Sequence, residues 1–137
     1  MAWTIAWTDR GIGVAHSKDL IHWSEQRRIG VMDHEPNALN AWAPDLFFDD
    51  ATNQFVIVWS TSIPGRFPAT DSLAEKTSRG RADHRLYYTT TKDFVTFSPG
   101  KLLYDGGYPT IDGTIARIGT RYVLVMKDET FFPERRN

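Results

Sequence analysis

Two aspartates, Asp45 and Asp112, stand at matched points of two similar stretches of sequence, 67 positions apart. The first is followed by the apolar run Phe55–Trp59, and the second by the apolar run Tyr122–Met126. Carboxylates can act as general acids or bases, and two that lie close together disturb each other's pKa. We therefore expect Asp45 and Asp112 to lie on the innermost strands of their sheets and to face a common axis or cleft.

Trp42 precedes Asp45 by three residues and is the aromatic candidate for a binding role. Its indole ring could stack on the face of a sugar ring or pack in the core of a β-sheet protein, and both interpretations are open. Aromatic residues make up 13% of the chain, which suits either role. The other tryptophans are expected to pack between sheets, and so is Tyr122; they are Trp3, Trp7, Trp23 and Trp59.

The remaining polar residues predict little further chemistry. The four histidines lack the spacing of metal ligands and the chain has no cysteine, so we expect no metal site and no cofactor. The cluster of Arg79, Arg81, His84 and Arg85 is interpreted as part of a solvated loop. The formal net charge is −1 and no basic stripe is present, which argues against a nucleic acid partner. No apolar run is long enough to predict a membrane span, and the compartment stays unknown.

A second repeat indicates which elements must position these residues. Ser17–Ser24 returns 74 positions later as Thr91–Ser98, with a Lys-Asp pair at the same place in both copies. The aspartates, Asp19 and Asp93, are expected to bond backbone amides of a bend and thus to be structural. The two repeats together define units of about 70 residues of short strands and turns, which is typical of β-propeller blades.

The predicted fold class is all-β, because no segment keeps a helical period over three turns. Residues 1–35 are expected to form an incomplete blade, residues 41–105 a complete blade and residues 110–137 the start of a third. The chain would then be a single, incomplete propeller domain of about two to two and a half four-stranded antiparallel sheets. Its strands would be the second to fourth of one unit, all four of the next and the first two of the last. Residues 64–83 are interpreted as a surface insertion that could rim a pocket.

Three segments, Ser17–Trp23, Trp42–Asp49 and Ile111–Ile115, resemble glycoside hydrolase family 43 in this order. The resemblance covers nearly the whole chain. It implies a five-bladed β-propeller that hydrolyses arabinose- or xylose-containing saccharides with inversion. It also implies three axial carboxylates, which are a general base, an aspartate that tunes the pKa of the acid, and a general acid.

The resemblance assigns one of these carboxylates. Asp112 matches the pKa-tuning aspartate, while the base is expected before Met1 and the acid after Asn137. Glu129 lies 17 residues after Asp112 and is not assigned the role of the acid. Asp45 and Trp42 are candidate sugar contacts, with a structural role as the alternative for each.

The leading hypothesis is a glycoside hydrolase-like chain acting on α-L-arabinofuranosyl or β-D-xylosyl linkages without a cofactor. The alternative is a non-catalytic carbohydrate-binding or structural propeller fragment that self-assembles, and a third possibility is a fragment whose function belongs to a longer parent. Unpaired blade edges invite association. Two chains could therefore form a homodimer in which each completes the broken blades of the other.

Overall fold

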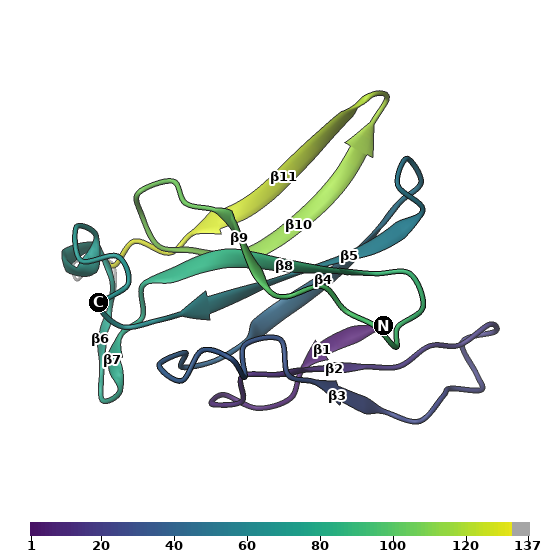
Figure 1. Cartoon of the computed structure of the whole chain (residues 1–137). Coiled ribbons are helices and arrows are strands. Elements are labelled where there is room, and N and C mark those ends of the chain that lie inside the picture. The colour runs from purple at the N-terminus through teal and green to yellow at the C-terminus, as the bar shows by residue number, and fades with distance from the viewer. Residues whose placement is uncertain (133–137) are drawn as a thin grey trace.

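The computed structural model describes residues 1–132, and these fold into separate antiparallel sheets with one short 3-10 helix (Figure 1). The first sheet has the order β1-β2-β3, the second β4-β5-β8-β9, and β10 and β11 form a third. The strands of these sheets are β1 (Ala2–Thr4), β2 (Ile12–Val14), β3 (Arg27–Ile29), β4 (Trp42–Asp49), β5 (Gln54–Ser62), β8 (His84–Thr91), β9 (Lys101–Tyr104), β10 (Thr110–Ile118) and β11 (Arg121–Asp128).

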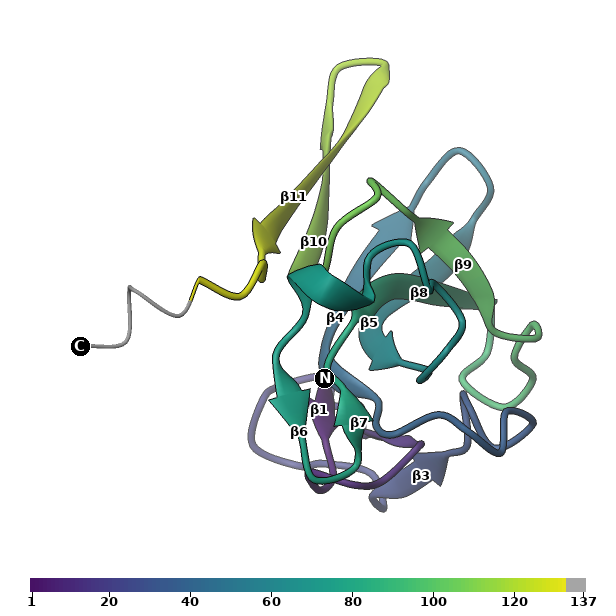
Figure 2. The same ribbon diagram turned by 90° about the vertical axis from the view of Figure 1, so that its left-hand side faces the viewer.

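The all-β fold of an incomplete, open propeller is confirmed. Strand β4, at one edge of the second sheet, packs against β1 of the first sheet and β10 of the third. These three strands are the inner strands from which the sheets fan out (Figure 2). The three, four and two strands of these sheets agree with the strands predicted for the three units within the described residues. We keep the division into blades at 1–35, 41–105 and 110–137 as a proposal, and residues 133–137 of the last range lie outside the described residues.

The main core lies between the first two sheets. Trp59 and Ile57 on β5 are fully buried and belong to one apolar cluster with Ile12 of β2 and with Met32, which follows β3. Alternate apolar residues on β5 give that strand one face toward this cluster. The predicted packing role of Trp59 is therefore confirmed. The prediction for Tyr122 is wrong, because this side chain on β11 is 50% exposed and the β10–β11 hairpin stands away from the core (Figure 1).

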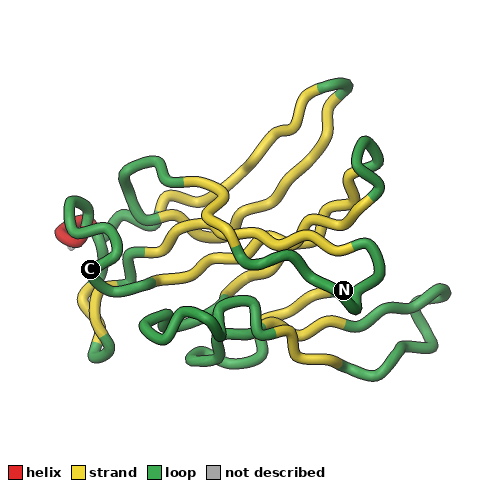
Figure 3. Tube along the Cα trace, in the orientation of Figure 1, coloured by secondary structure: helices red, strands yellow, loops and turns green. Residues whose placement is uncertain are grey.

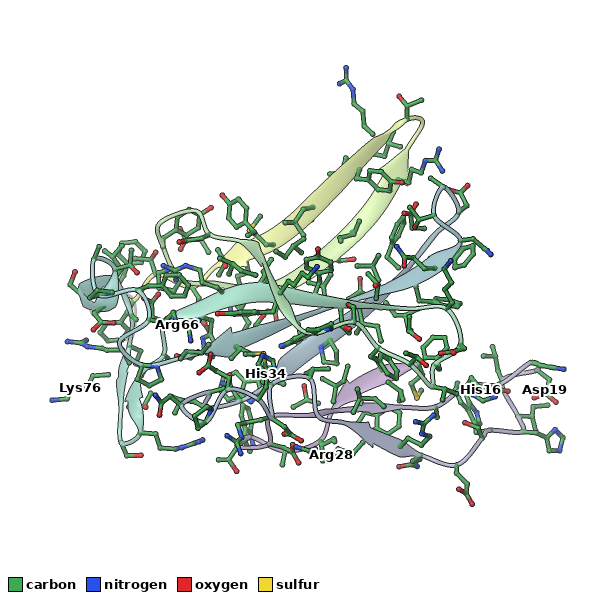
Figure 4. All side chains as sticks on the ribbon, in the orientation of Figure 1. His16, Asp19, Arg28, His34, Arg66 and Lys76 are labelled. Carbon is green, nitrogen blue, oxygen red and sulfur yellow. The ribbon has the colours of Figure 1, made fainter. Side chains whose placement is uncertain are left out.

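The repeated bend follows the third strand of each unit, β2 and β8, and has the same construction twice. Oδ1 of Asp19 accepts hydrogen bonds from the backbone N–H groups of Ile21 and His22. Oδ1 of Asp93 accepts from Val95 and Thr96 in the same way, and these bonds lower the pKa of Asp93. The structural role predicted for both aspartates is confirmed. Figure 4 shows Asp19 at the end of its loop, far from His34.

The 64–83 insertion is more ordered than the sequence suggests. It contains a 3-10 helix, η1 (Asp71–Leu73), and a small hairpin of β6 (Lys76–Thr77) and β7 (Gly80–Arg81) at one end of the molecule (Figure 3). None of the described residues forms a helix that is long and apolar enough to span a membrane.

Arg85 holds this insertion in place. Its guanidinium group is fully buried, lies over the ring of Phe67 and donates hydrogen bonds to Asp83, Asp105 and Thr70. The interpretation of Arg85 and His84 as solvated loop residues is wrong. Both residues lie on β8, which pairs with the buried strand β5 along its whole length, and both are almost fully buried.

Candidate functional site

Asp45 and Asp112 occupy different positions in their strands, contrary to the 67-residue alignment. Each inner strand has a β-bulge, between Trp42 and Asp45 in β4 and between Ile111 and Thr114 in β10. The bulges align when the offset is 69 residues, which pairs Asp112 with Ala43 and Asp45 with Thr114. The second strands still align at 67, because the turn after β4 is two residues longer than the turn after β10.

The bulges place Ala43 and Asp112 in the left-handed region of the backbone, with φ angles of 47° and 56°. Non-glycine residues are uncommon there, and Asp tolerates it better than most. A bulge breaks the alternation of side chains and redirects one of them, which is why bulges recur beside active sites. In β10 the redirected side chain is the exposed carboxylate of Asp112.

Gly113, the next residue in this bulge, explains how β10 can lie so close to β8. A Cβ atom at this position would come within 2.7 Å of Cδ1 of Leu86, a fully buried residue of β8. A larger residue would push the strand outward and carry the Asp112 carboxylate with it. Gly113 therefore fixes the position of its neighbour.

Asp45 joins the two inner strands to each other. Its Oδ2 accepts a hydrogen bond of 2.5 Å from Oγ1 of Thr114, its structural equivalent on β10. Both aspartates therefore lie on inner strands as predicted, but they do not face the same cleft, since Asp112 lines the cleft described next and Asp45 is not among its lining residues. A sugar contact of Asp45 stays a prediction.

An open cleft of about 760 Å³ lies at the bulged ends of β4 and β10, and we call it the Asp112 cleft. Its chemistry comes from two carboxylates, Asp112 and Glu129, and two indole rings, Trp7 and Trp42. The remaining wall is formed by Thr4, Ile5, Ala6, Ala43 and Ile111. A mostly apolar wall with a few polar groups is typical of small-molecule sites.

Trp7 and Trp42 are joined by a ring contact and a hydrogen bond. Their rings meet edge to face with centroids 5.2 Å apart, and Nε1 of Trp42 donates a 3.0 Å hydrogen bond to the carbonyl oxygen of Trp7. Trp7 is 77% exposed, so the prediction that it packs between sheets is wrong. The chain ends β1 at Thr4 and turns, which leaves this ring at the mouth of the cleft.

Glu129 is held by a buried polar chain that the sequence did not predict. Nδ1 of His84 lies 2.8 Å from Oε2 of Glu129, and Nε2 of the same ring lies 3.0 Å from Nδ2 of Asn40. The backbone N–H of Ser62 donates to Oδ1 of Asn40, so the amide NH₂ of Asn40 must face His84. His84 therefore accepts at Nε2 and donates from Nδ1 to the Glu129 carboxylate.

Two smaller clefts adjoin the Asp112 cleft, and Trp42 lines all three. The larger one, about 420 Å³, is called the insertion cleft and contains His84, Glu129, Glu75 and Thr77. Its other lining residues are Ala82, Lys127, Asp128, Thr130, Phe131 and Phe132. The smaller one, about 250 Å³, lies between Trp7 and residues 77–79. Within residues 1–132, no three His, Asp or Glu side chains are grouped as metal ligands would be.

This arrangement suits a ligand rich in hydroxyl groups. Carboxylates accept hydrogen bonds from hydroxyls, and an indole face covers the apolar C–H face of a sugar-like ring. Signals for part of the site are present in the sequence, since Asp112 belongs to a repeated segment and Trp42 precedes Asp45, in the other copy of that segment, by three residues. His84 and Asn40 carry no such signal, because 44 residues separate them and only the pairing of the sheets brings them together.

Comparison with known proteins gives one family and one relative. Residues 3–134 match the family described as a probable glycosyl hydrolase domain, related to glycoside hydrolase family 43. The chain is 28% identical over 123 residues to an α-L-arabinofuranosidase of Bifidobacterium longum subsp. longum. That match covers 88% of this chain and spans 12% of the length of the relative. Among solved structures, none matches significantly.

Proposed function

Because this chain belongs to the family of probable glycosyl hydrolase domains related to glycoside hydrolase family 43, we propose that it supplies part of the sugar-binding cleft of an inverting glycosidase. The proposed substrates are saccharides with α-L-arabinofuranosyl or β-D-xylosyl linkages. The observation that carries this proposal is the position of Asp112, whose bulge directs a carboxylate to the wall of a cleft with two indole rings.

Inverting hydrolysis defines what Asp112 would do. A general base takes a proton from water as the water attacks the anomeric carbon, and a general acid protonates the leaving oxygen. A third carboxylate near the acid raises its pKa, so that it still carries a proton at the working pH. We propose this tuning role for Asp112 and assign neither the base nor the acid within this chain.

Trp42 would provide the binding platform for the sugar. Its ring contacts the ring of Trp7 edge to face and lies beside the ring of His84, whose centroid is 5.0 Å away. A platform fixed in this way loses little side-chain entropy when a ligand binds. Asp45 would act mainly by tying β4 to β10, which keeps the bulges of both strands at the cleft.

The test is sugar binding by the whole chain, because neither the base nor the acid is assigned within it. We expect methyl α-L-arabinofuranoside or methyl β-D-xyloside to change the tryptophan fluorescence on binding, and Asp112→Asn to weaken this binding. Glu25→Gln is the matched control, because Glu25 is an exposed carboxylate away from the Asp112 cleft. Binding that Asp112→Asn leaves unchanged would argue against the role proposed for Asp112 and favour the non-catalytic carbohydrate-binding module instead.

We also propose that two chains associate to complete their sheets. The β10–β11 hairpin exposes Ile118, Tyr122 and Val125, each at least half exposed. A two-stranded ribbon with apolar side chains is marginal on its own and gains stability by packing. In the proposed homodimer this hairpin would join the first sheet of the partner, giving a ring of four blades.

A further inference from the structure

We propose that the insertion cleft is a second sugar subsite, in which Glu129, positioned by His84, binds a hydroxyl group of the sugar next to the one in the Asp112 cleft. This inference rests on the proposed function and extends it to substrate length. It assigns to the 64–83 insertion a role in selecting substrates by length.

The first argument is that the two clefts share a boundary. Trp42 and Glu129 line both of them, whereas Asp112 lines only one and Thr77 of the β6–β7 hairpin only the other. A saccharide that crosses this boundary would place one unit beside Asp112 and the next beside the insertion. The volume of the insertion cleft, about 420 Å³, lies within the range of about 300–1,000 Å³ for ligand sites.

The second argument is that Glu129 is placed for binding at this boundary. Its backbone N–H donates to the carbonyl oxygen of Pro109, and its Oε2 accepts from His84, which is itself 1% exposed. The carboxylate side chain is 30% exposed. Oε2 is committed to His84, so Oε1 is the oxygen that can accept a hydrogen bond from a ligand hydroxyl.

The third argument is that the wall of the insertion cleft is already formed. The buried Arg85 binds Asp83 and Thr70 of the insertion, and the backbone N–H of Phe131 donates a 2.8 Å hydrogen bond to the carbonyl oxygen of Leu73. The second contact ties η1 to the segment that follows β11. Ligand binding would therefore not have to order this segment first.

The experiment compares ligands of different length on the whole chain. Tryptophan fluorescence is titrated with methyl α-L-arabinofuranoside, a single sugar, and with α-1,5-linked arabinotriose. The trisaccharide is expected to bind at least tenfold more tightly than the single sugar. Glu129→Gln should weaken trisaccharide binding by roughly tenfold, as expected for loss of a hydrogen bond to a charged group, and single-sugar binding by a smaller factor, because the hydroxyl group proposed to bind Glu129 belongs to the second sugar.

His84→Gln tests the positioning role, because it should reproduce the ligand-length pattern of Glu129→Gln while trisaccharide binding by Glu25→Gln stays unchanged. Thr130→Trp, which places a large ring in the wall of the insertion cleft, should remove the advantage of the trisaccharide and leave single-sugar binding in place. Equal binding of both ligands by the unmodified chain would overturn the second subsite and leave the proposed function standing. Equal losses for both ligands in Glu129→Gln would also overturn it. Failure to bind either ligand would overturn the proposed function and this inference with it.

Discussion

Asp112 and Ala43 share a backbone conformation but differ in what the side chain gains from it. Both have a positive φ within the bulge of an inner strand. At Asp112 the conformation delivers a carboxylate to the cleft, whereas at Ala43 it delivers only a methyl group. The strain at Ala43 is thus the cost of a bulge that both strands share.

This difference predicts opposite effects of substitution. Ala43→Gly should raise the free energy of unfolding by about 0.5–1 kcal/mol, because glycine adopts a positive φ without strain. Asp112→Ala should lower it by about 1 kcal/mol, and Asp112→Asn should leave it nearly unchanged, since Asn tolerates this region. Urea unfolding of the three variants measures the series. Destabilisation by Ala43→Gly would contradict the role given to the bulge.

Arg28 binds two aspartates at the edge of the first sheet. Its Nη1 and Nη2 each donate a 2.7 Å hydrogen bond to Asp33, and its Nε donates to Asp9. The hydrogen bonds from Arg28 hold the pKa values of both aspartates below their ordinary values. The pKa of each aspartate is therefore lower in the folded protein than in the unfolded chain. The stabilisation that each ion pair with Arg28 provides is complete above the unfolded-state pKa of the aspartate, and it is lost as the pH falls through the folded-state pKa.

We therefore expect Asp33→Asn to lower the free energy of unfolding at pH 7 and to have no effect once the pH lies below the folded pKa of Asp33. The loss at pH 7 should be small, since Arg28 and Asp33 are both partly exposed. Urea unfolding between pH 7 and pH 2 measures the difference. A difference that persists unchanged at the lowest pH would show that Asp33 acts through something other than its charge.

At the scale of elements, the buried Arg85 keeps the 64–83 insertion ordered, so that the insertion can form the wall of the insertion cleft. Removal of one partner from a buried ion pair costs about 3–5 kcal/mol, because the other charge stays buried without compensation. Asp83 is in that situation, with 3% of its surface exposed. We expect Arg85→Met to lower the free energy of unfolding by this amount.

A second substitution separates the charge effect from a packing defect. Asp83→Asn in the Arg85→Met background should restore part of the loss, since it removes the uncompensated charge. Limited proteolysis should cleave Arg85→Met first within residues 64–83, ahead of global unfolding. If the unmodified chain is cut there equally fast, the insertion is not held by Arg85.

The elements were predictable to the extent that they are local and repeated. The bend at Asp19 returns at Asp93 because its hydrogen bonds stay within a few residues, so the sequence pattern and the structure coincide. The bulge at Asp112 was missed because a bulge is a change of register between strands. The same limit hid the contact of His84 with Glu129, which depends on packing between two sheets.

At the scale of the whole molecule, the sheets are unequal in how well they are covered. The first two enclose the core around Trp59, whereas the third projects as a two-stranded hairpin (Figure 2). Aromatic residues make up 13% of the sequence, but the sequence does not show which of their rings are buried, because burial depends on how neighbouring sheets pack. Tyr122 and Trp7 were misassigned for this reason.

The proposed homodimer makes a prediction at this scale. Light scattering at micromolar concentration should give twice the chain mass of 15.7 kDa. Val125→Asp should shift this value toward the monomer, because it places a charge on an exposed apolar face that the dimer would bury. Gln54→Glu, on the second sheet, is the control for added charge. A mass of 15.7 kDa for the unmodified chain would rule out the dimer.

The edge-to-face contact of Trp7 with Trp42 also has an optical consequence. Two indole rings with centroids 5.2 Å apart and planes at 85° are close enough for their excited states to couple. Such a pair contributes a split signal of opposite signs to the circular dichroism spectrum, which the buried Trp59 would not produce alone. We expect a sugar ring that binds to Trp42 to change this split signal. Circular dichroism would therefore follow binding at the cleft without an added label.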